Sequence, residues 1–267
     1  MRIRRLLLVF AASIGSGAFP AIVAAQATGD QSSLVFTISL GAVSGSRLWS
    51  SSPQAVQFII PADTFALERR IRSTLAVGFG GAYFPGENVG FTGEAFLIGL
   101  GFENSCRHLF LSGAGEMAEV CQSIQGKGGV ATSVILSAGT IFRLNSRKLI
   151  SPYGRVNAGL VLSNQSSLRT TGQYLSAEGI ADKFVYADDH NSRVDPSLAL
   201  GVGFTAAIAK GYGLRWEVRD NITGIQRVTS TTPIAGSVPP HERVFKHLFS
   251  MTIGFDVVLE RRRGRRY

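Results

Sequence analysis

The sequence lacks any apolar run long enough for a membrane-spanning helix. Such a helix needs about 20 consecutive apolar residues, and no uncharged apolar stretch of this 267-residue chain approaches that length. Charged residues make up only 17% of the chain, and 31 glycines are spread through it. A chain of this composition that meets a membrane must therefore do so with strands.

Cysteine and histidine are scarce. The two cysteines, Cys106 and Cys121, have one histidine nearby, His108, which is too small a ligand set to favour a zinc site. In an exported chain, the 15-residue spacing predicts a disulfide that closes one loop, with two free thiols as the alternative. Asp188-Asp189-His190 is interpreted as a solvated polar loop, with a loop metal site as the alternative.

The four histidines also bear on catalysis. All of them fall in predicted connections or at a strand end, so no histidine meets a nucleophile and a carboxylate in a catalytic arrangement. His247 and Ser250, for example, are three residues apart and lie on opposite faces of a strand. The sequence therefore predicts a protein that is not an enzyme.

The net charge of +9 is concentrated at the two ends of the chain. Three of the 27 basic residues lie in the first 25 positions and five lie in the last seven, which leaves 19 basic against 18 acidic residues. This nearly neutral body lacks a broad basic surface for phosphates, so nucleic acid is not an expected partner. The basic segment 260–267 is interpreted as a solvated tail that can contact anionic head groups.

Residues 1–25 have the three parts of a secretory signal peptide. A basic start with Arg2, Arg4 and Arg5 precedes the short apolar run Leu6–Ala12, and the small residues Val23-Ala24-Ala25 form a cleavage site. An N-terminal membrane anchor is the alternative. The prediction is an exported chain whose remaining body, residues 26–259, forms one domain.

The segment Pro196–Thr223 shows the strand pattern most clearly, as two strands joined by a turn at Lys210–Gly213. The bulky side chains of its first strand share one face: Leu198, Leu200, Val202, Phe204, Ala206 and Ile208. In the second strand one face carries Leu214, Trp216 and Val218, and the other carries Arg215, Glu217 and Arg219. This period of two indicates a narrow closed barrel with lipid outside and a packed polar lumen.

The same alternation recurs along the chain. Further strands are predicted at about Leu34–Val43, Leu67–Phe84, Val89–Glu103, Val130–Leu144, Ile150–Leu162 and His247–Leu259. Turns of about four residues alternate with long connections, as in outer-membrane barrels with short periplasmic turns and long extracellular loops. The count is eight strands, with ten as the alternative if two more lie within the long connections, and both termini are predicted to be periplasmic.

From about residue 34 to 259, this pattern resembles the small outer-membrane β-barrel superfamily, the OmpA-like and OmpW-like proteins of Gram-negative bacteria. The segment Leu214–Asn221 is similar to the penultimate strand of such barrels, although Glu260 and the arginine-rich tail follow the final strand here. The resemblance implies an all-β, eight-stranded antiparallel up-and-down transmembrane barrel in the outer membrane. Its expected partners are outer-membrane lipids and the barrel-assembly machinery, and a monomer is expected.

Gly201–Ala206 matches the dinucleotide-binding pattern G-x-G-x-x-A. The match lies inside an alternating strand and no helical period follows it, so the glycines are interpreted as making room in a crowded lumen. No cofactor is expected.

Seven charged residues are predicted to point into the barrel: Glu94, Arg143, Arg155, Arg215, Glu217, Arg219 and Asp256. Buried charges must pair or meet water, so the interpretation is a structural ion-pair network centred on Glu217. A gated narrow pore lined by the same residues is the alternative.

The function expected from these observations is non-enzymatic, in envelope integrity or in surface interactions through the loops. A narrow pore or carrier for small or apolar solutes is the second hypothesis, and a lipid-modifying outer-membrane enzyme is the third.

Overall fold

The computed structural model describes residues 32–51, 54–56, 63–99, 101–110, 115–125, 128–129, 132–144, 148–164, 166–188, 193–230 and 234–260. The predicted signal peptide, residues 1–25, and all of the predicted tail after Glu260 lie outside the described residues.

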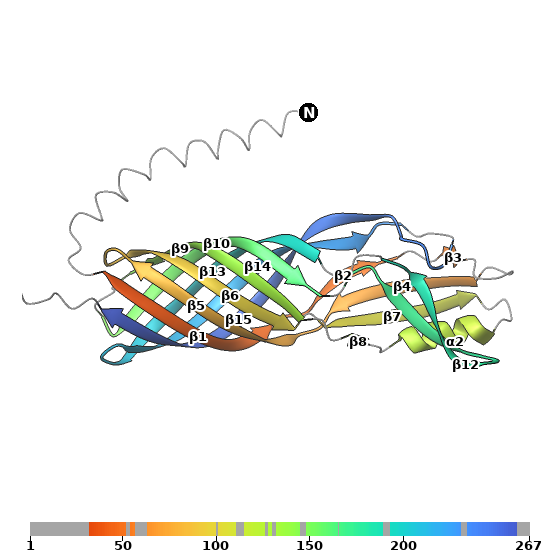
Figure 1. Ribbon diagram of the computed structural model, residues 1–267, viewed down its shortest axis with the longest axis horizontal. Coiled ribbons are helices and arrows are strands. Elements are labelled where there is room, and N and C mark those ends of the chain that lie inside the picture. The colour runs from red at the N-terminus through yellow and green to blue at the C-terminus, as the bar shows by residue number, and fades with distance from the viewer. Residues whose placement is uncertain are drawn as a thin grey trace, which may run out of the picture.

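Eight antiparallel strands close into a barrel (Figure 1). They are β1 (Ser33–Val43), β5 (Thr74–Phe84), β6 (Val89–Gly99), β9 (Thr132–Arg143), β10 (Ile150–Ser163), β13 (Arg193–Ala209), β14 (Tyr212–Val228) and β15 (His241–Glu260). Each pairs with its neighbours in chain order, and β1 closes the ring by pairing with both β5 and β15. The predicted eight-stranded up-and-down barrel is confirmed, and the alternative of ten barrel strands is wrong.

The outer surface of the barrel is apolar. Along β1, Phe36 and Ile38 are 48% and 60% exposed, whereas Val35 and Ser39 on the other face are buried. The same alternation continues around the barrel, for example at Val202, which is 66% exposed. In water such a surface would be unstable, but in a bilayer it faces acyl chains, and closure gives each of the eight strands a neighbour on both sides. The barrel is therefore a transmembrane barrel.

Two of the predicted strands each contain two strands of the structure. The predicted strand 67–84 contains the end of β4 (Asp63–Ile71) and all of β5, and the predicted strand 89–103 contains β6 and the start of β7 (Phe102–Phe110). In the first case the chain passes from a separate sheet into the barrel, and in the second it passes from the barrel into that sheet. Alternation continues across each break, which is why period two alone predicted a single strand.

The long connections are folded into a compact unit that we call the cap. It contains β2 (Ser46–Ser50), β3 (Gln54–Val56), β4, β7, α2 (Gly115–Ile124), β8 (Gly128–Gly129), β11 (Thr170–Ser176) and β12 (Gly179–Tyr186). The cap extends the molecule along the barrel axis, at the end opposite the short turns (Figure 1). The sequence predicted these segments only as long connections and did not identify the strands and the helix within them. Among the described residues, no helix is long and apolar enough to cross a bilayer.

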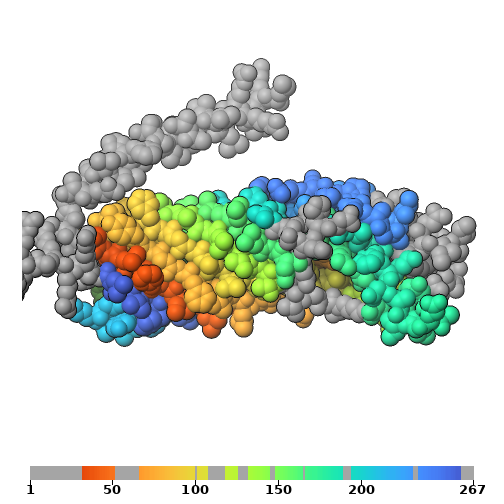
Figure 2. Space-filling model, viewed as in Figure 1, coloured from red at the N-terminus to blue at the C-terminus, as the bar shows by residue number. Residues whose placement is uncertain are grey.

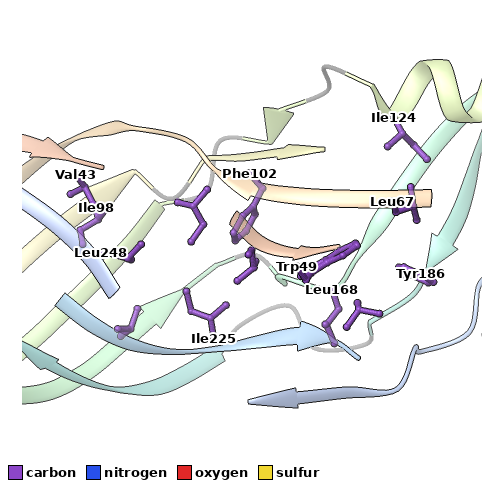
Figure 3. Packing of buried hydrophobic residues seen from close by; sticks show 14 of the residues in the cluster. Val43, Trp49, Leu67, Ile98, Phe102, Ile124, Leu168, Tyr186, Ile225 and Leu248 are labelled. Carbon is purple, nitrogen blue, oxygen red and sulfur yellow. The ribbon is translucent and has the colours of Figure 1, made fainter. Parts of the chain in front are cut away.

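One hydrophobic cluster joins the cap to the barrel. Val43, Ile98 and Leu248 point inward at the mouth of the barrel, and the cluster continues to Leu67 and Phe102 in the cap (Figure 3). Each of these five side chains is no more than 6% exposed. Because the two parts share one core, the cap is expected to be ordered without any partner.

The described chain begins and ends at the same end of the barrel. Ser33 pairs with Glu260, and β1 lies beside residues 250–260 of β15 (Figure 2). The short connections between β5 and β6, β9 and β10, and β13 and β14 lie at this end too, and we call it the turn end.

Candidate functional site

Four charged side chains from three strands meet in the middle of the barrel. Both Arg155 of β10 and Arg219 of β14 contact Glu217, at 2.6 and 2.8 Å. The same two arginines also contact Glu94 of β6, at 3.1 and 2.9 Å. All four side chains are at least nine-tenths buried.

A second ion pair lies next to these four residues. Arg215 binds Asp256 at 2.9 Å and lies over the ring of Tyr153, whose hydroxyl donates a 2.6 Å hydrogen bond to Glu217. Thr37 donates to the other carboxylate oxygen of Asp256. Three arginines thus face three carboxylates, and this balance is what allows six charges to be buried together. We call these six charged residues and Tyr153 the lumen network.

The glycines of the apparent dinucleotide pattern make room for the network. A Cβ atom at Gly201 would lie 2.8 Å from a carboxylate oxygen of Glu217, and one at Gly203 would lie 2.8 Å from the hydroxyl of Tyr153. Both glycines lie within strand β13.

Arg143 lies apart from the network, closer to the turn end. Its guanidinium stacks 3.8 Å above the ring of Phe84, and its Nε donates to the backbone oxygen of Glu87 at 2.6 Å. The structure therefore brings together six of the seven predicted charges, with Arg143 near the turn between β5 and β6. Tyr153 was missed as a network residue, although it shares a strand face with Arg155.

The lumen is closed a second time between the network and the cap. Phe96 contacts the guanidinium of Arg219 at 4.5 Å, and beyond it Ile98, Ile135 and Val161 fill the mouth of the barrel. These four side chains are at most 6% exposed. We call them the apolar plug. Within the network itself, a cavity of about 20 Å³ leaves room for about one water molecule.

A buried arginine holds the cap together. Arg69 of β4, 2% exposed, donates to the backbone oxygens of Ser167 and Arg169 at 2.7 Å each and to Asn104 of β7 at 2.7 Å. Burial lowers the pKa of Arg69 to about 9. The side chain thus ties β4 and β7 to the segment that leads into the hairpin β11–β12.

Trp49 of β2 completes this contact. Its ring lies 5.4 Å from the guanidinium of Arg69 and 6.1 Å from the ring of Tyr186, and its Nε1 donates to the backbone oxygen of Ser167 at 3.0 Å. Sequence analysis placed Trp49 in a connection and Arg69 in a barrel strand, because their partners lie far away in the sequence.

The predicted disulfide is confirmed. Cys106 of β7 is bonded to Cys121 of α2, with a Cα–Cα distance of 5.3 Å. The helix in turn covers one edge of the hairpin, where Ser123 and Glu119 accept hydrogen bonds from the backbone nitrogens of Gln173 and Leu175. The disulfide therefore holds α2, and through it the hairpin, on the sheet of the cap.

Loss of this disulfide is expected to lower the free energy of unfolding of the cap by about 3 kcal/mol, the value for a 15-residue loop. The chain has two tryptophans, so a Trp216→Phe background makes Trp49 the only tryptophan reporter, located in the cap. Urea titrations of Trp49 fluorescence with and without Cys106→Ser/Cys121→Ser measure the difference. An unchanged midpoint would contradict the role of the disulfide.

Two of the histidines, His241 and His247, have structural neighbours. Nδ1 of His247 lies 2.7 Å from Asp220, and Nδ1 of His241 lies 2.9 Å from the backbone oxygen of Pro239. Within the described part of the chain, no group of three or more histidine, cysteine, aspartate or glutamate side chains could hold a metal ion. Asp188 contacts the hydroxyl of Ser166, while Asp189 and His190 lie outside the described residues.

Comparison with known proteins gives structural similarity only. No protein-family model and no curated protein matches the chain. The outer membrane protein OprG from Pseudomonas aeruginosa has a TM-score of 0.46 and 11% identity, with 86% of this chain and 98% of that chain covered. Neisserial surface protein A has a TM-score of 0.42 and 9% identity, with 85% and 99% covered. Ail, the attachment invasion locus protein of Yersinia pestis, has a TM-score of 0.36 and 12% identity, with 84% and 98% covered.

Similarity at this level carries no argument about function, so the assignment of the fold rests on this chain's own strand pairing and apolar exterior. The protein is an eight-stranded antiparallel β-barrel with an apolar outer surface, as the sequence predicted.

Proposed function

We propose that this protein is a non-conducting, non-enzymatic outer-membrane barrel that presents its cap as a rigid surface for interactions outside the cell. The observation that carries the proposal is the hydrophobic cluster shared by the barrel and the cap, which includes Val43, Ile98 and Phe102. Loops held in this way keep one shape before they meet a partner, so binding does not have to order them first.

The closed lumen supports the non-conducting part of the proposal. The lumen network blocks the middle of the barrel with charges that neutralise one another, and the apolar plug fills the mouth below the cap. An ion would have to break the ion pairs of Glu217 and then pass a desolvated layer of side chains.

The proposed orientation places the cap outside the cell and the turn end, with both chain termini, in the periplasm. Long connections on the outside and short turns inside are the usual arrangement in bacterial outer-membrane barrels. The turn end also carries the basic residues Lys148 and Lys210.

Single-channel recording in planar bilayers tests the closed lumen. The purified full chain is expected to give no reproducible conductance steps above those of a protein-free bilayer. A stable open state would contradict the proposal and favour the alternative, a narrow pore whose polar section is the lumen network.

Thiol labelling of intact cells tests the orientation, because both native cysteines are in the disulfide. Glu178→Cys, in the turn of the hairpin β11–β12, is expected to react with a membrane-impermeant maleimide on intact cells. Lys210→Cys, at the turn end, is expected to react only after lysis. Labelling of both variants in intact cells, or of Lys210→Cys alone, would overturn the orientation.

A further inference from the structure

The turn end of the barrel contains a cavity that the lumen network does not use. Its volume is about 240 Å³, and it lies between the strand ends and the ion pair of Arg215 and Asp256. Its wall is mixed: apolar side chains such as Val35, Ile141 and Val258 alternate with polar ones. The cavity therefore ends at the ion pair of Arg215 and Asp256, and its wall carries both apolar and polar side chains.

Two polar groups in this wall have no partner among the described residues. Ser33 is 8% exposed, and its hydroxyl oxygen is buried without a hydrogen bond. Lys148 lines the cavity from the connection between β9 and β10 as an exposed ammonium group. A buried hydroxyl without a partner is unfavourable, so a ligand that supplies an acceptor there stabilises the site.

The charges that face the cavity favour an anion. Arg215 is neutralised by Asp256, so that pair offers no net charge. The guanidinium of Arg143 lies against the ring of Phe84 and interacts with the carboxylate of Glu87, so the further positive charge at the cavity is that of Lys148. The apolar wall in turn requires part of the ligand to be hydrocarbon.

We propose that this cavity binds a small amphipathic anion, with a carboxylate or phosphate head and a single apolar chain. The head group accepts hydrogen bonds from Lys148 and Ser33, and the chain lies against Val35, Ile141 and Val258. Both a free fatty-acid-like molecule and the chain of an anionic lipid have this chemistry. The site is a property of the turn end, so it does not depend on which side of the membrane that end faces.

Octanoate is a suitable probe, measured by equilibrium dialysis against the full chain in zwitterionic nanodiscs, with empty nanodiscs to subtract partition into lipid. The wild type is expected to bind octanoate saturably, with one site per chain. Lys148→Gln is expected to weaken binding by about tenfold, the effect of losing one charge-assisted hydrogen bond. Lys210→Gln is the matched control, because Lys210 lies at the same end and does not line the cavity.

Two further variants keep the test independent of the surface lysine. Ala207→Phe puts a ring into the cavity and is expected to abolish saturable binding of octanoate. Its folding is verified by the heat-dependent gel shift, in which a folded barrel migrates faster in SDS gels before boiling than after it. Ser33→Ala is expected to weaken binding by about threefold to tenfold. Adding phosphatidylglycerol to the nanodiscs distinguishes the two sources of the ligand. If phosphatidylglycerol lowers the binding of octanoate, the site binds the anionic lipid. If the binding of octanoate does not change, the site binds a soluble ligand.

The proposal is overturned if octanoate shows only the partition seen with empty nanodiscs. Equal weakening by Lys148→Gln and Lys210→Gln would overturn it too, since the effect would then be general surface charge. Binding of octyltrimethylammonium as tight as that of octanoate would exclude an anion site. None of these results bears on conductance or labelling, so the proposed function is tested separately.

Discussion

Replacing Glu217 with alanine is expected to lower the free energy of unfolding of the barrel by about 3–5 kcal/mol, the cost of leaving a buried ion pair without one partner. Glu217 accepts hydrogen bonds from the side chains of Arg155, Arg219 and Tyr153, and these hydrogen bonds are buried or partly buried. Its loss leaves three arginines facing two carboxylates in the middle of the membrane. Urea titration of the barrel in lipid vesicles, read by the fraction that migrates as folded without boiling, measures this effect.

A double variant separates charge imbalance from lost packing. Glu217→Ala/Arg219→Ala restores the balance of charges and is expected to be less destabilised than the sum of the two single variants. Glu242→Ala is the matched control, since its pair with Arg227 is about half exposed and contributes about 0–1 kcal/mol. A loss below about 1 kcal/mol for Glu217→Ala would contradict the account of the network.

Replacing Trp49 with alanine is expected to destabilise the cap by about 3–5 kcal/mol, as for other buried aromatic residues. The ring is 4% exposed and packs between Arg69 and Tyr186. Its removal leaves a cavity at the junction of β2, β4 and the segment before β11. Limited proteolysis is expected to cut the cap of this variant quickly, while the barrel keeps its heat-dependent gel shift.

Trp49→Phe is the control for this variant. Phenylalanine retains most of the packing and loses the hydrogen bond to Ser167, for an expected cost of about 1 kcal/mol. Equal cleavage of the wild type and Trp49→Ala would show that the cap does not depend on this contact. Loss of the gel shift in Trp49→Ala would show that the barrel cannot form without the cap.

The barrel was predictable because its physical environment repeats every second residue. Lipid outside and a crowded lumen inside impose period two on every strand, and Leu198 to Ile208 display it without interruption. The short turns were equally clear, since the predicted turn at Lys210–Gly213 joins two strands that pair with each other in the structure.

The charged residues of the lumen were predictable as a set, and their pairing was not. Alternation predicts that Glu94 and Arg155 face the lumen. The stagger between strands decides which lumen-facing residues lie at the same height along the barrel axis. Arg143 has the same face as Arg155 on the neighbouring strand, yet it lies at the level of the turn and contacts Phe84. Only the strand register of the closed barrel separates the two.

The cap could not be predicted from local pattern. Trp49 contacts Ser167, which is 118 positions away, and Arg69 contacts Thr170, which is 101 positions away. The sequence between them has prolines and short polar stretches typical of loops. Of the contacts within the cap, the sequence predicted only the disulfide between Cys106 and Cys121, which bonds β7 to α2 in the structure.

Hydrogen–deuterium exchange of the full chain in lipid nanodiscs tests the central claim most directly. If the cap and the barrel share one core, the backbone amides of β4, β7 and β11 will exchange slowly, with protection approaching that of β5 and β6. Exchange of the cap amides within seconds, next to a protected barrel, would contradict the account. The cap would then be a set of mobile loops on a closed barrel rather than a rigid surface.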